Sequence, residues 1–384
     1  MAGKRGDGEG TIRQRKEGLW EALYSYRDEA GNLKRRSLYA KTQREVSEKL
    51  RAALAILDKG EAPITEKQTV AQFLDRWLAD VVRPNVRPKT HDSYSQVVRL
   101  YLSPMLGRHQ LVKLTPQHVQ GMMNTLLTKG GTKKTGISPR TVQYARAVLR
   151  KALGQALKWG LVGRNVATLV DPPKSERYEM RALTPQEAGT FLEAVRGDRL
   201  EALYAVAVAL GLRQGEICGL RWEDVDFERR QISVRKQAQR IGGKAQLVDL
   251  KTRQSRRTIA LPKVIAAQLR AHKIRQNEER LQAGERWQNW ELVFPSTIGT
   301  PLEPSNLTKR YKSILKGAGL PTIRFHDLRH SCASLLIAQG IPARTVMETL
   351  GHSQITLTLN TYAHIFPEVQ RQAADAMDRL FETA

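Results

Sequence analysis

The stretch Gly211-Leu212-Arg213-Gln214-Gly215-Glu216 ends a long apolar run with an arginine, two further polar side chains and two glycines. Three later stretches are similar, because each carries polar and charged residues where a core pattern would have apolar ones. They are Leu250-Lys251-Thr252, His326-Asp327-Leu328-Arg329-His330, and Leu350-Gly351-His352 together with Asn360-Thr361-Tyr362. We call these stretches the four polar segments, and we expect them to carry chemistry rather than packing.

The two arginines of these segments suit an anionic phosphate. Transfer of a phosphodiester to a protein hydroxyl puts extra negative charge on the non-bridging oxygens. Arginine is always charged and donates two hydrogen bonds side by side. Arg213 follows a glycine-containing turn at a predicted helix end, and Arg329 lies three residues after His326, so both are expected to project toward one phosphate. The alternative is that they bind DNA passively or pair with Glu216.

In this order and at these separations, the four polar segments resemble the active-site motifs of the tyrosine recombinase (phage-type integrase) family. One His-x-x-Arg or one tyrosine means little, but the full set is specific, and the resemblance extends to nearly the whole chain. It implies a site-specific DNA recombinase that cleaves and rejoins strands through a 3′-phosphotyrosine intermediate, integrating or excising a mobile element. It also implies that no metal and no nucleotide cofactor are needed.

The resemblance makes Tyr362 the nucleophile and Lys251 the general acid. A phenol with a pKa near 10 is neutral at pH 7, so nearby cations or a base must assist Tyr362. The leaving 5′ oxygen needs a proton, which Lys251 would supply. Lys251 ends one strand of a predicted hairpin in which Val248–Lys251 turns back to Arg256–Ile259. The alternative for Tyr362 is a core aromatic residue. For Lys251 the alternatives are a flexible surface lysine, or its neighbours Lys244 and Arg253 in the catalytic place.

The histidines and Glu216 complete the predicted site. His326 and His352 match the family's two histidine positions, the first as general acid or base and the second as a hydrogen-bond donor to the phosphate. His330 and His364 are interpreted as structural, and Glu216 as a residue that positions its neighbours. A metal site is the alternative, but the histidines have no carboxylate ligands beside them and the arginines would repel a divalent cation. We therefore expect none.

The composition points to a polyanionic partner. The 384 residues include 63 Lys and Arg against 38 Asp and Glu, a formal net charge of +25. This excess is larger than solubility requires and favours nucleic acid, with an anionic membrane as the alternative. The apolar run Ala202–Leu212 is too short to span a bilayer, and no apolar segment follows the charged N-terminus, so we expect a cytoplasmic protein. Cys218 and Cys332 are expected to be reduced core residues.

The predicted fold is multidomain and mainly α. Three strands at Thr11–Arg15, Leu19–Arg27 and Leu33–Tyr39, then a helix capped by Thr42, form a small sheet-plus-helix module. Strands Gln231–Arg240, Gln246–Leu250 and Arg256–Ala260 are expected within a mixed α+β catalytic domain of the tyrosine recombinase type. The expected domains are an arm-type DNA-binding module at 1–64, a helical bundle core-binding domain at 65–170, a linker at 171–182 and the catalytic domain at 183–384.

Seven cations are the predicted DNA contacts outside the catalytic segments. Basic strands can enter a DNA groove, and a flexible basic loop can reach a backbone, while a solvated basic face is the alternative. They are Arg13, Arg15, Lys34, Arg35 and Arg36 on or beside the N-terminal strands, and Lys133 and Lys134 in a glycine-containing loop.

The expected partners follow from strand exchange. Exchange between two duplexes implies a homotetramer on double-stranded DNA, at core sites and at arm sites, with an accessory directionality or DNA-bending factor as a candidate partner. Two alternatives use the same fold or chemistry. A type IB topoisomerase acts as a monomer, and the arm-like N-terminal module argues against it. A catalytically inert DNA-binding regulator is disfavoured by the complete set of polar segments.

Overall fold

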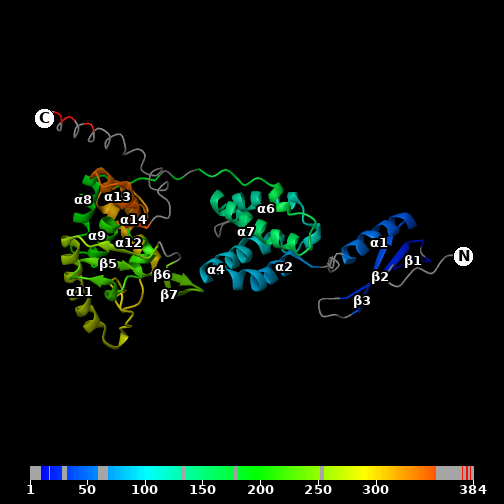
Figure 1. Cartoon of the computed structure of the whole chain (residues 1–384), viewed down its shortest axis with the longest axis horizontal. Coiled ribbons are helices and arrows are strands. Elements are labelled where there is room, and N and C mark those ends of the chain that lie inside the picture. The colour runs from blue at the N-terminus through cyan, green and yellow to red at the C-terminus, as the bar shows by residue number, and fades with distance from the viewer. Residues whose placement is uncertain are drawn as a thin grey trace. The chain divides into compact units, whose positions relative to one another are not determined.

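The computed structural model describes residues 10–16, 18–27, 33–58, 68–130, 135–176, 178, 180–250, 255–351, 374, 378 and 381. The chain divides into two compact units, Met1–Glu176 and Arg177–Ala384, and each part is described here by itself (Figure 1). Five residues of the predicted site lie outside the described residues: Lys133, Lys134, Lys251, His352 and Tyr362.

The N-terminal part is an antiparallel sheet with a helix on one face (Figure 1). Strand β2 pairs with β1 on one side and with β3 on the other. Ala22 and Tyr24 of β2 pack against Val46 and Leu50 of the helix, and Thr42 accepts the predicted capping hydrogen bond. The predicted arrangement of three strands and a helix is confirmed, and one bound of each strand differs by one residue: β1 Thr11–Gln14, β2 Trp20–Arg27, β3 Leu33–Ala40 and α1 Gln43–Asp58.

The rest of the first unit is helical, as predicted. The Thr-Pro and Ser-Pro starts act as caps, because Thr115 and Ser138 accept hydrogen bonds from backbone amides in the first turns of α6 and α7. One apolar core holds these helices together. The elements are α2 Val70–Trp77, η1 Leu78–Val82, α3 Arg83–Asn85, α4 Pro88–Val97, η2 Val98–Leu102, α5 Ser103–Leu106, η3 Leu111–Lys113, α6 Pro116–Lys129, α7 Pro139–Lys158 and η4 Val166–Leu169.

The second unit mixes helices with two small sheets around one main core. Helix α9 is buried along nearly all of its length, as expected for the apolar run, and α13 packs against it. The elements are α8 Pro185–Ala194, α9 Glu201–Leu210, α10 Gln214–Cys218, η5 Trp222–Asp224, β4 Val225–Asp226, β5 Gln231–Val234, β6 Lys236–Ile241, β7 Lys244–Asp249, β8 Arg257–Ala260, α11 Lys263–Ala283, η7 Gly284–Arg286, α12 Pro304–Gly317, α13 Asp327–Ala338 and α14 Ala343–Leu350.

Two strand predictions for this unit were wrong. The predicted strand Gln231–Arg240 is broken at Arg235, and its halves β5 and β6 belong to different sheets. Strand β7 pairs with β6, whereas β8 pairs with β5, so Val248–Lys251 and Arg256–Ile259 do not form a hairpin with each other. The physical reason is the Gly242-Gly243 turn, whose φ angles of +56° and +80° favour a tight local hairpin between β6 and β7.

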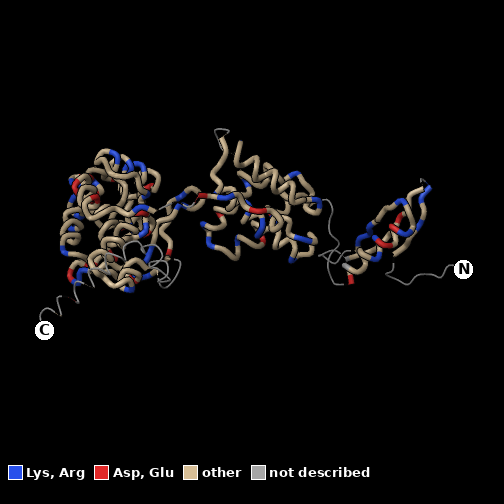
Figure 2. Tube along the Cα trace, turned by 90° about the horizontal axis from the view of Figure 1, so that it is seen from above, with Lys and Arg blue, Asp and Glu red and all other residues tan. Residues whose placement is uncertain are grey.

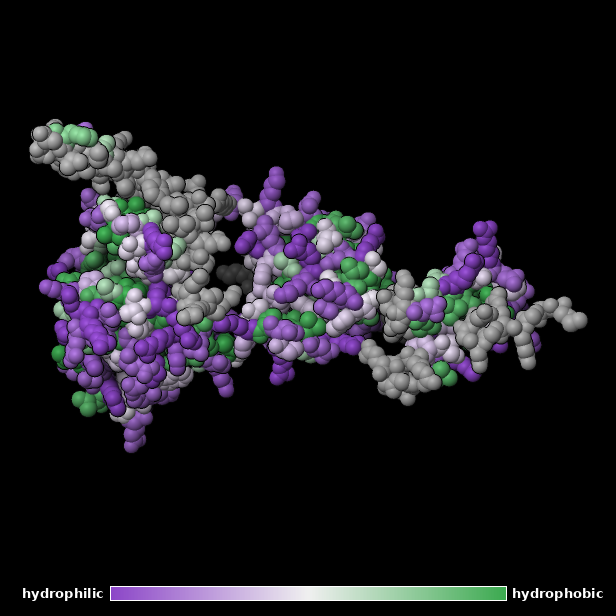
Figure 3. All heavy atoms as spheres, viewed as in Figure 1, coloured by the Kyte–Doolittle hydropathy of each residue, from purple (hydrophilic) through white to green (hydrophobic). Residues whose placement is uncertain are grey.

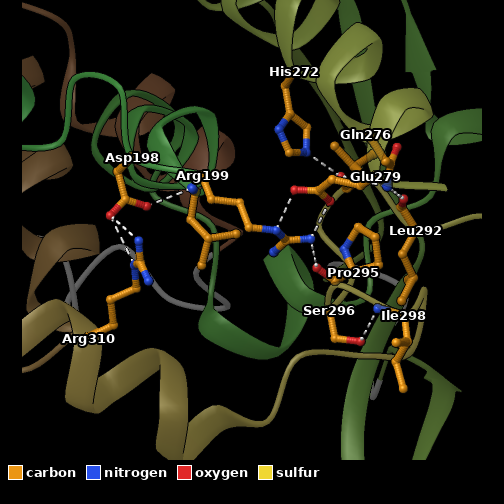
Figure 4. Close-up of polar contacts among 12 residues, drawn as sticks. Asp198, Arg199, His272, Gln276, Glu279, Leu292, Pro295, Ser296, Ile298 and Arg310 are labelled. Atoms are coloured by element: carbon orange, nitrogen blue, oxygen red, sulfur yellow. Dashed lines mark hydrogen bonds and ion pairs between the residues drawn. The ribbon is translucent and has the colours of Figure 1, made fainter. Parts of the chain in front are cut away.

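A polar network ties the start of α9 to α11 and α12 (Figure 4). Arg199 donates to both carboxylate oxygens of Glu279, at 2.6 and 2.7 Å, and to the carbonyl of Pro295 at 3.0 Å. Arg310 of α12 donates two hydrogen bonds to Asp198, at 2.7 and 2.9 Å. This network holds one end of α9 in place, and the other end carries Arg213.

The surface is mainly hydrophilic in the view of Figure 3. Lys and Arg are spread over all parts of the chain rather than gathered in one of them (Figure 2). Among the described residues, no helix is long and apolar enough to cross a bilayer. Both cysteines, Cys218 and Cys332, are buried and free, as predicted.

Candidate active site

The turn between α9 and α10 presents Arg213. Helix α9 ends at Gly211, whose φ of 59° lies in the left-handed region that favours glycine. Arg213 then caps α10, and its Nη1 lies 2.7 Å from Oε1 of Glu216. Its backbone amide donates to Oε2 of the same carboxylate at 3.0 Å. The glycine turn expected from the sequence is therefore present, and the arginine also pairs with Glu216.

Glu216 is the centre of the cluster. Its side chain is 1% exposed, and it accepts hydrogen bonds from Arg213 and from Arg257, whose Nη2 lies 3.0 Å from Oε2. Burial alone would raise the pKa of Glu216, but Arg257 and then Arg213 lower it below its ordinary value. The carboxylate stays ionised at neutral pH. It is placed to hold two arginines.

Arg257 on β8 is a site residue that the sequence analysis missed. Its side chain is 7% exposed. Besides Glu216, it donates through Nε to the carbonyl of Thr349 at 2.7 Å, near the end of α14. Arg213 donates to the carbonyl of Gly351 at 3.1 Å, just beyond that helix. The available signal was strand alternation, since Ile259, two residues along β8, is buried and therefore shares a face with Arg257.

Arg329 reaches the same turn from α13. It is 2% exposed, and its Nη1 donates to the carbonyl of Gly211 at 2.8 Å, two residues before Arg213. The structure thus brings the two predicted phosphate-binding arginines to one place. The two arginines are 116 positions apart in the chain.

His326 precedes the first turn of α13 and lies beside these cations. The pKa of His326 is lowered below its ordinary value. The main cause is the loss of hydration on burial, and the positive charges of Arg329 and Arg213 lower it further. The imidazole is therefore neutral at pH 7 and able to accept a proton. Part of the residue nevertheless remains exposed to solvent, where a substrate can reach it.

His330 packs behind His326. The two ring centroids are 5.3 Å apart and the rings are perpendicular. Burial first, and then the neighbouring His326, lower the pKa of His330 to about 4. His330 is therefore a half-buried, neutral imidazole at pH 7. His364 lies outside the described residues.

Asp327, between the two predicted site residues of α13, anchors the start of the unit. It is fully buried and accepts hydrogen bonds from the Tyr178 hydroxyl at 2.8 Å and from Arg324 Nη2 at 3.0 Å. The Arg324 guanidinium carbon lies 3.6 Å from the Tyr178 ring centroid. The segment before α8 is thereby attached to the helix start that presents His326. Tyr178 was not predicted from the sequence, because nothing local links it to Asp327, 149 residues away.

The arrangement is suited to an anion. Arg213 and Arg257 hold one buried carboxylate, Arg329 donates to the adjoining Gly211 carbonyl, and the neutral His326 lies beside Arg329 and Arg213. Fixed guanidinium groups in a partly desolvated site stabilise phosphate charge. Within the described ranges, no group of three His, Cys, Asp or Glu side chains could hold a metal ion.

The five predicted N-terminal DNA contacts do not share one face of the sheet. The strand register places Arg13 and Arg35 on the face opposite α1, which we call the outer face. Lys34 and Arg36 stand opposite Tyr26 and Tyr24, on the face that packs on α1. Arg15 follows β1.

Comparisons with known proteins give consistent matches. A model of the phage integrase family matches residues 181–368, and a model of the phage integrase N-terminal SAM-like domain matches residues 69–127. The chain is 32% identical over 375 residues to a tyrosine recombinase XerC-like protein of Caldanaerobacter subterraneus, covering 92% of this chain and 94% of that protein. It is 30% identical over 355 residues to an integrase of Streptomyces ambofaciens, covering 89% and 88% respectively.

Solved structures of similar fold include two integrases bound to DNA. The Tn1549 transposon integrase in complex with a circular intermediate DNA has a TM-score of 0.64 at 22% identity, covering 82% of this chain and 100% of that one. A lambda integrase tetramer bound to a Holliday junction has a TM-score of 0.55 at 21% identity, covering 90% and 96%. At these identities the similarity concerns the fold.

Proposed function

The chain belongs to the phage integrase family and is a tyrosine-type site-specific DNA recombinase, and from this premise we propose how its residues cleave and rejoin DNA. The observation that carries the proposal is the convergence of Arg213 and Arg329 on the Gly211 turn, with Glu216 and Arg257 buried behind Arg213. These side chains come from separate elements and meet at one place, where Arg213 also donates to the carbonyl of Gly351, the residue that precedes His352 in the sequence.

The arginines bind the scissile phosphate. Arg213 and Arg329 donate to its non-bridging oxygens, where charge increases as the fifth ligand of phosphorus arrives. Glu216 and Arg257 hold Arg213 from behind, so little side-chain freedom is lost when DNA binds. His352 donates a further hydrogen bond to the phosphate.

The covalent step moves one proton on each side of phosphorus. The Tyr362 oxygen forms the new bond to phosphorus, and neutral His326 accepts the phenol proton. The bond from phosphorus to the 5′ oxygen breaks, its electron pair stays on that oxygen, and Lys251 supplies the proton. The 3′-phosphotyrosine conserves the energy of the broken bond. A 5′ hydroxyl of a partner strand therefore reverses the reaction without a nucleotide cofactor and without a metal.

The domain plan gives the chain two kinds of DNA site. We assign an arm-binding module to 1–64, a core-binding domain to 65–170, a linker to 171–182 and the catalytic domain to 183–384, with Lys133 and Lys134 as backbone contacts. Separate apolar cores in the N-terminal module, the helical part and the second unit support this division. Integration or excision of a mobile element joins two duplexes, so four protomers act together on double-stranded DNA. An accessory directionality or bending factor is a candidate partner.

Replacement of Tyr362 tests the function. Tyr362→Phe removes the nucleophilic oxygen and leaves the phosphate contacts, so it should abolish covalent DNA attachment while changing DNA affinity less than about twofold. The purified full-length chain is mixed with a nicked duplex taken from the DNA that flanks its gene, and covalent complexes are counted on denaturing gels.

Tyr144→Phe in the helical part is the matched control and should leave covalent attachment as in the wild type. Covalent complex in Tyr362→Phe at the level of this control would show that another residue is the nucleophile.

A further inference from the structure

The outer face of the N-terminal sheet holds a buried carboxylate. Glu21 of β2 is 1% exposed. Ala22 and Tyr24 of the same strand pack with α1, and because side chains alternate along a strand, Glu21 lies on the opposite, outer face. A carboxylate on a sheet face that none of the described helices covers would ordinarily remain in water. Its burial must therefore come from side chains on the same face.

Two arginines and a tyrosine enclose Glu21. Arg13 Nε and Nη2 each lie 2.8 Å from Oε2, and Arg15 Nε lies 3.2 Å from the same oxygen. The Tyr39 hydroxyl donates to Oε1 at 2.9 Å. The Arg15 guanidinium carbon also lies 5.4 Å from the Tyr39 ring centroid. The carboxylate thus holds one residue of β1, the residue that follows β1 and one residue of β3 in one cluster.

The cluster keeps a positive charge that faces solvent. Burial alone would raise the pKa of Glu21, but hydrogen bonds led by those from Arg13 and Tyr39 lower it to about 2. At neutral pH the cluster therefore contains one negative carboxylate and two positive guanidinium groups, so its net charge is positive. The side chains of Arg13 and Arg15 are 58% and 45% exposed, against 2% for Glu21. The cations lie outermost and the carboxylate lies beneath them.

This geometry prepares arginine to recognise a pair of acceptors. An arginine side chain that is free in solution loses rotamer entropy when it binds. A carboxylate that already holds the guanidinium in place makes this loss of entropy on binding smaller. In Arg13 the carboxylate occupies the Nε–Nη2 edge, which leaves the Nη1–Nη2 end for two acceptors side by side. Guanine offers such a pair, O6 and N7, in the major groove.

We propose that Glu21 is a positioning residue that fixes Arg13 and Arg15 to read guanine in duplex DNA through the outer face of the sheet. The inference rests on the proposed function, because it requires that residues 1–64 bind DNA. Lys34 and Arg36, on the other face, would at most add phosphate attraction. Glu21 therefore determines base preference, whereas the total charge of the module determines non-specific affinity.

The experiment compares sequence preference with salt dependence. The full-length chain selects binders from a pool of duplexes with a randomised segment, and dissociation constants are measured for a selected duplex and for copies with each guanine changed to adenine. The wild type should lose about tenfold in affinity at one or two guanines, the magnitude of a bidentate contact. Glu21→Gln should reduce that loss to less than about threefold, with an unchanged slope of affinity against salt.

Glu45→Gln is the matched control, because it makes the same change of charge on the exposed side of α1 and should keep the wild-type preference. If circular dichroism shows that Glu21→Gln disrupts the fold of the module, the Glu21→Asp variant is measured in its place. The aspartate keeps the charge but withdraws the carboxylate by one methylene, and should weaken the preference. Wild-type preference in a folded Glu21 variant would overturn the inference.

Deletion of residues 1–64 separates this inference from the proposed function. If the deletion removes the guanine preference and the Glu21 variants keep it, the module reads DNA but Glu21 does not position its arginines. If the truncated chain selects the same duplexes as the full chain, both the arm-binding role of the module and the inference are wrong.

Discussion

Glu216 and Glu21 use the same physical device in different parts of the chain. Each carboxylate is 1% exposed and accepts hydrogen bonds from two arginines. Removing one partner of a buried ion pair costs more than the pair contributes, because the remaining charge is left without compensation. Each cluster is therefore sensitive to the loss of a single side chain, and each gives arginine a fixed direction.

Arg257→Met tests the cluster around Glu216. The variant fills a similar volume but leaves the buried carboxylate with Arg213 alone, so the free energy of unfolding should fall by about 3 kcal/mol. Covalent attachment to DNA should fall with it, because Arg213 loses its support. Urea denaturation of the full chain and the covalent-complex assay measure the two effects.

Arg256→Met, at the neighbouring position with a side chain 58% exposed, is the control and should stay within about 0.5 kcal/mol of the wild type. Equal stability of the two variants would contradict a structural role for Arg257.

Glu21 gives the N-terminal module an acid-sensitive stability. Its pKa is lowered from an ordinary value of 4.5 to about 2 in the folded state. The stabilising contribution is therefore fully present above pH 4.5 and is lost as pH falls toward 2. Amide hydrogen exchange in β2 should show a difference between wild type and Glu21→Gln that is constant at neutral pH and shrinks below pH 4.5. A difference that does not change down to pH 2 would mean that Glu21 is not ionised in the fold.

At the scale of elements, one turn joins the ends of several helices. Gly211 ends α9, its carbonyl accepts from Arg329 of α13, and it lies against Leu350 of α14. The left-handed backbone and the close approach both exclude a larger residue. This turn fixes the position of Arg213, because the tight packing around Gly211 allows few other backbone conformations.

Gly211→Ala should therefore be destabilising. A Cβ at this position would lie 2.4 Å from Cδ2 of Leu350, a side chain that is 0% exposed and so has nowhere to move. Left-handed strain and overpacking together should lower the free energy of unfolding by about 2 kcal/mol or more. Gly189→Ala in α8, where an added Cβ meets nothing within 4 Å, should be neutral or slightly stabilising. Thermal unfolding of both variants compares them directly, and equal midpoints would show that the turn adapts.

At the scale of the whole molecule, the charge is distributed rather than concentrated. The net charge of +25 arises from Lys and Arg in every part of the chain (Figure 2). Such a distribution suits a protein that holds DNA at more than one site, because each part can neutralise phosphates by itself.

Removal of residues 1–64 tests this division of labour. The truncated chain should bind and cleave a short core duplex within about threefold of the full chain, because the helical part and the second unit keep their own cores. Recombination that depends on flanking arm sequences should disappear, and the affinity for long duplexes should depend less steeply on salt. Footprints of both proteins on the same attachment DNA provide the measurement. Identical protection by the two would show that the N-terminal charge is only a solvated face.

The sequence alone determined the family, the N-terminal sheet and helix, the capped starts of α6 and α7, and the glycine turn before Arg213. These features depend on neighbours within a few residues or on motifs in a set order. The strand pairs near Lys251 were predicted wrongly from the sequence. Alternation of apolar and polar residues predicts that a strand exists, but it does not say which strand it pairs with.

Only the tertiary structure decided which polar groups meet. Arg257 and Glu216 are 41 residues apart in the chain, and Tyr178 and Asp327 are 149 apart. Arg329 was predicted to belong to the site. The sequence did not predict that it would be buried and would donate a hydrogen bond to the Gly211 carbonyl. Such contacts depend on how helices pack around a common core, and local periodicity carries no information about partners at that distance.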